Sequence, residues 1–174
     1  IEFEQLSESD AVTPQAGFSY RLTDFAAIYG SYSESFEPNA ALPDGNGGTA
    51  VFDPETGEQI EFGIKAEFFD GKAQASLAVY EIEKQNVRVG TGDAGRPIFA
   101  EGASAEGVEL TFAGQPVPGM NVTTSYAYID ASTSDGDALR GVAENVFNIY
   151  ASYEWQGGRL QGLGIGGGVF YEGE

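Results

Sequence analysis

The chain has 174 residues and a formal net charge of −19, with 27 acidic residues against 8 basic ones. It has no basic stripe that could neutralise phosphates, which excludes nucleic acid as a partner. It has no cysteine, which excludes a disulfide framework and a thiolate metal site. With 12 Phe and 9 Tyr residues it is too rich in aromatics for a disordered acidic tail, so we expect a folded chain.

Neither a membrane-spanning helix nor a signal peptide is predicted. No apolar run reaches the roughly 18 residues of a transmembrane helix, and the N-terminus lacks the basic and apolar regions of a signal peptide. The chain begins and stops inside predicted strands, at Ile1–Leu6 and Gly162–Tyr171, so we expect it to be part of a longer protein.

Apolar and polar residues alternate with a period of two along most of the chain, which predicts strands with two different faces. In chain order, the predicted strands are 15–22, 25–36, 58–69, 72–88, 101–114, 120–131, 144–156 and 160–172. Tight turns are predicted at Thr23-Asp24, Asp70-Gly71, Pro116–Gly119 and Gln156–Arg159, and long loops near 37–57, 89–100 and 132–143. This alternation is typical of an all-β, antiparallel, up-and-down transmembrane β-barrel with periplasmic turns and extracellular loops.

The Asp70-Gly71 turn predicts the register of one hairpin. Between alternating strands this dipeptide favours a two-residue type I′ turn, in which Phe69 faces Lys72. One face of the hairpin is then apolar, with the pairs Phe68–Ala73, Ala66–Ala75, Ile64–Leu77 and Phe62–Val79. The other face is polar or small, with the pairs Glu67–Gln74, Lys65–Ser76, Gly63–Ala78 and Glu61–Tyr80. A slip of one residue would mix the two faces, so the pattern supports this register. The apolar column ends at Ile60–Glu81.

The register is less well defined at both ends of the predicted sheet. A two-residue turn at Thr23-Asp24 places on one face Phe18, Tyr20, Leu22, Phe25, Ala27 and Tyr29, but it leaves Ile28 among polar residues. The glycine-rich strand 160–172 can pair with strand 144–156 in either register. An apolar and a polar face also describe half of a soluble β-sandwich. Long hairpins, and charged residues facing small ones, favour the wide lumen of a barrel instead.

Several segments follow one another in a fixed order and spacing over residues 15–172: Tyr29–Asn39, Pro54–Gly71, Leu77–Val87, Gly107–Leu110 and Ser125–Tyr128. Together they resemble the barrel of TonB-dependent siderophore receptors. The resemblance implies that residues 1–174 are a partial barrel domain, about eight strands of a barrel of about 22. The plug domain and the C-terminal strands would lie outside this chain.

The resemblance also implies a function in the bacterial outer membrane. Such a receptor takes up a ferric siderophore, driven through the TonB protein, with its plug domain inside the barrel and outer-membrane lipid around it. The chain is therefore expected to be no enzyme and to hold no cofactor, because the iron travels within its chelate. Two alternatives remain open: the same architecture for cobalamin, haem or a glycan, and a free-standing eight-strand outer-membrane barrel.

Three aromatic residues are the predicted substrate-binding residues: Phe36, Phe52 and Tyr80. Phe36 and Phe52 lie in or next to the loop 37–57, where ring faces suit the burial of a weakly polar chelate. Plain packing within the loop is the alternative for both rings. Tyr80 belongs to the polar face, opposite Glu61.

The remaining candidates are charged or aromatic clusters. Asp53 with Glu55, and Asp135 with Asp137, could ligate Ca²⁺, but they lack the regular ligand spacing of a calcium loop, so we predict solvated loops and no metal site. Carboxylates on the polar face could act in acid–base chemistry, but no nucleophile or His accompanies them, and we interpret this face as a lumen wall against the plug. An aromatic girdle is predicted beside the short turns, formed by Phe25, Phe68, Phe69, Phe112, Tyr153 and Trp155.

Overall fold

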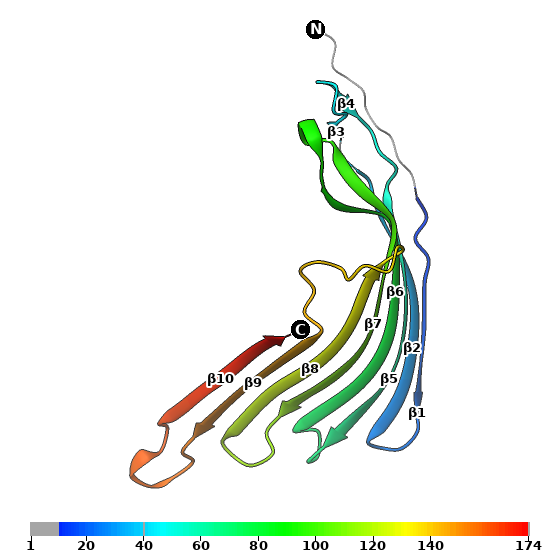
Figure 1. Cartoon of the computed structure of the whole chain (residues 1–174). Coiled ribbons are helices and arrows are strands. Elements are labelled where there is room, and N and C mark those ends of the chain that lie inside the picture. Colours follow the sequence, from blue (N-terminus) through cyan, green and yellow to red (C-terminus); the bar gives the residue numbers. More distant parts are fainter. Residues whose placement is uncertain (1–10, 40, 174) are drawn as a thin grey trace.

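The computed structural model describes residues 11–39 and 41–173, and its main feature is one curved antiparallel sheet (Figure 1). The eight strands stand in the order β1-β2-β5-β6-β7-β8-β9-β10. Each strand of this sheet therefore pairs with the strand of the sheet that follows it along the chain. Their bounds are β1 Gln15–Arg21, β2 Ala26–Glu37, β5 Glu55–Phe68, β6 Ala73–Thr91, β7 Pro97–Gly114, β8 Met120–Thr133, β9 Asn145–Glu154 and β10 Gly164–Gly173. The eight strands predicted from residue 15 onward are confirmed, whereas the predicted strand Ile1–Leu6 lies outside the described residues.

The remaining elements are short and lie in the connections. The β2–β5 connection contains the paired strands β3 (Leu42–Pro43) and β4 (Thr49–Ala50). The helical turns η1 (Asp93–Gly95) and η2 (Gly158–Leu160) lie in the β6–β7 and β9–β10 connections. No helix in the described ranges is long and apolar enough to cross a membrane. In Figure 1 the β1–β2, β5–β6, β7–β8 and β9–β10 connections lie at the lower end of the sheet and the other three at the upper end, which is the predicted alternation of the two ends. The long loop predicted near 89–100 is wrong in length: the connection is only residues 92–96, because β6 continues to Thr91 and β7 begins at Pro97.

The register of the β5–β6 hairpin is confirmed. Phe68 pairs with Ala73, and all the other predicted pairs of the two strands follow. The residues Asp70 and Gly71 have φ angles of 55° and 79°, as a type I′ turn requires of its two central positions. The Lys72 N–H donates to the carbonyl oxygen of Phe69 at 3.3 Å and closes the turn.

The β1–β2 turn corrects one prediction. Tyr20 pairs with Ile28, one residue away from the register of a two-residue turn. The connection is longer because the Thr23 N–H donates to the carbonyl oxygen of Ala26, at 3.1 Å, instead of closing a tighter turn. A shift of one residue moves side chains to the opposite face. Ile28 therefore lies on the apolar face, and Ala27 and Tyr29 lie on the polar face, where Arg21 was predicted and is found.

The register of the last strand, which the sequence leaves open, is defined by the structure. Gly168 pairs with Tyr150 and Gly164 with Glu154. The connection runs over residues 155–163, longer than the tight turn predicted at Gln156–Arg159, and the Gly162 N–H donates to the carbonyl oxygen of Trp155 at 3.0 Å.

The two faces of the sheet differ in polarity along its whole width. On the apolar face, one row of cross-strand partners consists of Tyr20, Ile28, Ile64, Leu77, Leu110, Tyr126, Phe147 and Tyr171. This apolar band ends at a row that contains Ile60, Glu81, Glu106 and Asp130, which confirms the limit predicted at Ile60–Glu81.

The sheet has no packed core on either face. Phe62 is 53% exposed and Leu77 44%, whereas the buried apolar residues in the described part of the chain are the small Ala73, Ala78 and Ala103. A soluble sandwich would cover the apolar band with a second sheet, but the described ranges contain only the two-stranded β3–β4 pair besides this one. The band is therefore a surface that something other than the described residues must cover.

Candidate functional site

The centre of the polar face is built around Tyr29, Glu61 and Lys65. The Tyr29 hydroxyl donates to Glu61 Oε1 at 2.6 Å, and Lys65 Nζ lies 4.4 Å from the centroid of the Tyr29 ring. The ring fits here because its cross-strand partner is Gly63, where a Cβ would lie only 2.4 Å from the ring. A carboxylate, a hydroxyl and an ammonium group thus form one polar cluster on the wall.

Tyr80 extends this cluster onto the next strands. It pairs with Glu61 on one side and with Gly107 on the other. Its ring lies against Gly107, where a Cβ would meet the ring Cζ at 2.4 Å. Glu109, two residues beyond Gly107, faces the small residue Ala78 on the same polar face. Tyr80 is therefore part of the polar wall, as the predicted register requires.

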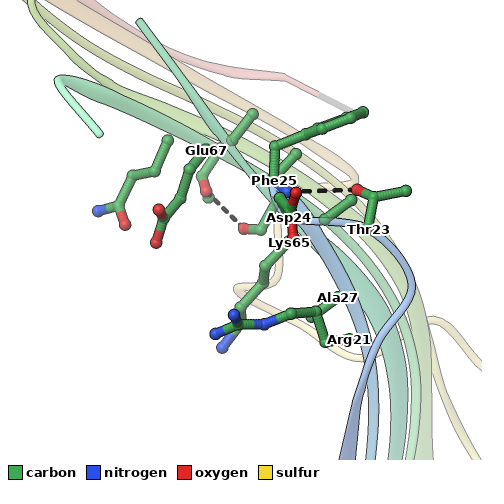
Figure 2. Close-up of a pocket in the computed structure, with 13 residues that line it drawn as sticks. Arg21, Thr23, Asp24, Phe25, Ala27, Lys65 and Glu67 are labelled. Carbon is green, nitrogen blue, oxygen red and sulfur yellow. Dashed lines mark hydrogen bonds between the residues drawn. The ribbon is translucent and has the colours of Figure 1, made fainter. Parts of the chain in front are cut away.

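A hollow of about 460 Å³ lies on the polar face near the short-turn end of the sheet. Arg21 and Lys65 line it from either side of Ala27, their common neighbour in β2. Figure 2 shows these two cationic side chains pointing the same way, with Glu67 beside them. On the far wall, the hydroxyls of Ser76 and Thr111 lie 2.7 Å apart and share a hydrogen bond. The hollow therefore offers charged hydrogen-bond donors, from Arg21 and Lys65, and neutral ones, from Ser76 and Thr111.

The three predicted substrate-binding residues occupy different parts of the molecule. Tyr80 lies on the polar wall, whereas Phe36 pairs with Thr56 and alternates with Ser35 and Glu37, so it shares the face of the apolar band. Phe52 lies in the β2–β5 connection, and its ring centroid is 5.1 Å from that of Phe99. The structure does not bring the three side chains into one site.

Phe99 and Gly107 are the residues that the sequence did not single out. Phe99 belongs to a strand distant in sequence from Phe52, and no local pattern connects the two. Gly107 belongs to one of the segments that resemble the receptor family. Its contact with the Tyr80 ring, however, depends on the β6–β7 register, which the sequence does not define. Within the described ranges, no three Asp, Glu, His or Cys side chains converge to hold a metal ion.

The predicted girdle residues lie beside the short turns. The rings of Phe68 and Phe69 have centroids 6.4 Å apart at the β5–β6 turn. Tyr153 and Trp155 pack edge to face, 5.3 Å apart, at the end of β9. Aromatic rings at this level, next to an apolar band, are typical of a membrane–water interface.

These features define a class of protein: a section of wall from a large antiparallel β-barrel, apolar outside and polar inside. The family model that describes the β-barrel of TonB-dependent receptor-like proteins matches residues 3–174. The chain belongs to this family.

Two curated relatives and one solved structure illustrate the similarity. The chain is 32% identical to the ferric-pyoverdine 358 receptor of Pseudomonas putida over 95% of its own length and 21% of that receptor. It is 33% identical to the metal-pseudopaline receptor of Pseudomonas aeruginosa over 94% of its length and 24% of that receptor. The structure of the Pseudomonas aeruginosa ferripyoverdine receptor, bound to ferripyoverdine, matches with 28% identity and a TM-score of 0.80, over 95% of this chain and 23% of that one.

The chain therefore spans between a fifth and a quarter of the length of these relatives. Its open sheet is a section of a larger barrel, as the resemblance implies. The fold prediction is confirmed in this respect.

Proposed function

We propose that this chain is part of the barrel wall of a bacterial outer-membrane receptor that takes up a ferric siderophore, driven through TonB. It acts as a transport protein and not as an enzyme. The observation that carries the proposal is the row of apolar partners that crosses all eight strands on one face of the sheet. It is combined with the match to the receptor family over residues 3–174. Lipid covers the apolar band, since a barrel of this kind exposes such a band to the bilayer.

The charges of the polar wall favour the presence of a partner domain inside the barrel. Glu61 bonds only to neutral groups of the wall, the Tyr29 hydroxyl and the Gln59 amide, and the one ion pair among the described residues joins Lys84 to Glu55. Burying a charge without a partner is costly, so charged groups of a filled lumen are expected to pair with opposite charges on the filling. A plug domain encoded elsewhere in the receptor supplies that filling.

The names of the relatives support the substrate class. They include receptors for ferric pyoverdine and for metal-pseudopaline, which are chelates of metal ions. A receptor for cobalamin, haem or a glycan remains the second candidate on the same architecture. A free-standing eight-strand barrel is disfavoured, because β1 pairs only with β2 and β10 only with β9 among the described residues.

The loop between β2 and β5 provides the test. It lies at the long-loop end of the sheet, beyond the rows of the apolar band, so deleting residues 41–51 from the full-length receptor should leave membrane insertion intact. Binding of the cognate ferric complex, identified first from a panel of iron chelates, should weaken. The measurement is titration of the purified receptor. Unchanged affinity would remove this loop from the binding site, and a receptor that binds haem or cobalamin but no iron chelate would favour the second candidate.

A further inference from the structure

One row of cross-strand partners on the polar face contains no carboxylate. From β1 to β10 it consists of Arg21, Ala27, Lys65, Ser76, Thr111, Ser125, Asn148 and Phe170, and it is here called the donor row. Arginine, lysine, hydroxyl and asparagine side chains all donate hydrogen bonds. At this one level the wall therefore presents donors and no negative charge.

The two cations of the donor row share one neighbour. Arg21 pairs with Ala27, and Ala27 pairs with Lys65, so the two cationic residues stand two strand spacings, about 10 Å, apart at the backbone. The small side chain of Ala27 leaves the space between them free, and Figure 2 shows Arg21 and Lys65 pointing the same way into it. Both side chains are exposed. Two like charges directed at one space repel each other unless an anion lies between them.

Neither cation is paired within the described part of the chain, where the one ion pair joins Lys84 to Glu55. Lys65 is nevertheless held in position, because its Nζ lies 4.4 Å from the centroid of the Tyr29 ring and a ring face attracts a cation. The Tyr29 hydroxyl in turn donates to Glu61 Oε1 at 2.6 Å. A group that is already positioned binds a partner with a smaller entropic cost than one that must first become ordered.

Two carboxylates, Asp24 and Glu67, line the same hollow nearer the short turns. Asp24 lies in the β1–β2 connection, beyond the end of both strands. Glu67 follows Lys65 by two residues, which is about 7 Å along a strand. An anion that contacts a cation at about 3.5 Å is attracted about twice as strongly as a carboxylate at about 7 Å repels it. The place between Arg21 and Lys65 therefore remains favourable for a negative charge.

The position of the hollow indicates what occupies it. It lies near the short-turn end of the sheet, opposite to the β2–β5 loop, the proposed contact of the chelate (Figure 1). The described residues leave this face uncovered, and the chain spans only a fifth to a quarter of the length of its relatives. The remaining part of the receptor is thus available to supply a partner. A planar guanidinium binds a carboxylate through two parallel hydrogen bonds, so an acidic side chain is the complementary group.

We propose that Arg21 and Lys65 bind the carboxylate of an aspartate or glutamate that belongs to the domain inside the barrel. The inference rests on the part of the proposed function that places a plug domain there, and it adds the chemistry and the level of one contact. The acid of the plug lies at the level of Lys65, about 13 Å along β5 from Glu61.

The test treats the full-length receptor with a water-soluble carbodiimide, which joins an ammonium group and a carboxylate in contact as an amide. Mass spectrometry of the peptides then identifies each linked pair. Lys84 and Glu55, whose Nζ and Oε1 lie 2.5 Å apart, are the internal control and should be linked. We expect Lys65 to be linked to an Asp or Glu of the plug domain. K65Q should lose this product and keep the control product, whereas E67Q should keep both.

An exchange of charges makes the test specific. In Lys65→Glu the product should be absent, and it should return when the plug acid identified by the linkage is also changed to lysine. Lys65 linked to Glu67 or Glu61 in place of a plug residue would overturn the inference, as would an unlinked Lys65 in a receptor that gives the Lys84–Glu55 product. If that receptor still binds a ferric chelate, the uptake function stands. A Lys65–plug product in a receptor that binds no iron chelate would support the inference and remove the proposed substrate.

Discussion

At the scale of single residues, glycines determine where the large side chains of the polar wall can lie. Tyr29 and Tyr80 each lie against a glycine of the neighbouring strand, Gly63 and Gly107, where a Cβ would come within 2.4 Å of the ring. A ring that lies flat over a glycine covers the exposed backbone and projects little from the surface of the sheet. The polar face can therefore present hydroxyls and carboxylates without side chains that block the lumen.

Asp44 makes the loop between β2 and β5 sensitive to acid. Hydrogen bonds from the N–H groups of Asn46 and Gly48, with a smaller contribution from the nearby Arg96, hold the pKa of Asp44 below its usual value. A carboxyl whose pKa is lowered by folding stabilises the folded form above its usual pKa of about 3.9, and this stabilisation is lost as the pH falls through the lowered value. We expect the amides of Asn46 and Gly48 to stay protected from hydrogen exchange down to about pH 4 and to lose protection below it.

Asp44→Asn provides the control for this experiment, because it keeps a hydrogen-bond acceptor but cannot titrate. Exchange measured by mass spectrometry, corrected for the intrinsic pH dependence, should show weaker protection in this variant that does not change with pH. An identical acid-induced loss in the variant would mean that another group controls the loop.

At the scale of elements, the number of residues in a turn determines what each strand presents to its two sides. The β5–β6 turn keeps Ile64 on the apolar face and Lys65 on the polar face. The β1–β2 connection has one residue more than a two-residue turn predicts, and it moves Tyr29 to the polar face. Because side chains alternate with a period of two, a single extra residue reverses the assignment of a whole strand.

Ile64 and Lys65 allow these faces to be tested. Ile64→Lys places a charge on the apolar band, and such a substitution near the bilayer midplane costs about 2–4 kcal/mol. Lys65→Gln changes the polar face and should cost much less. Both are measured as the free energy of folding of the full-length receptor into lipid vesicles, from urea titrations. Equal losses for the two variants would contradict the assignment of the faces.

At the scale of the whole molecule, the described sheet is open. Among the described residues, β1 pairs only with β2 and β10 only with β9, so the outer edges of both strands carry backbone groups without a partner there. The apolar band likewise has no covering within this part of the chain. Unpaired N–H and C=O groups are not tolerated in hydrocarbon, so only closed barrels cross a membrane as sheets. Strands that pair with these two edges would therefore contribute to the stability of this section.

We expect residues 1–174, produced alone, to aggregate or to require detergent, and to form no closed pore. Size-exclusion chromatography and gel mobility before and after heating measure this, because folded outer-membrane barrels migrate differently from unfolded ones. The full-length receptor is the positive control. A monodisperse, heat-modifiable barrel from residues 1–174 would show that the chain closes on itself and would favour the small free-standing barrel.

The sequence by itself determined the eight strands, the side of each long loop and the β5–β6 register, because these depend on local alternation and on one turn dipeptide, Asp70-Gly71. Local alternation does not contain the number of residues in an irregular turn, so the faces of β2 and the register of β10 became known only from the pairing of whole strands. The contact of Phe52 with Phe99 is likewise a tertiary result. It joins two loops that neither periodicity nor turn chemistry connects, and only the position of the strands below them brings the two rings together.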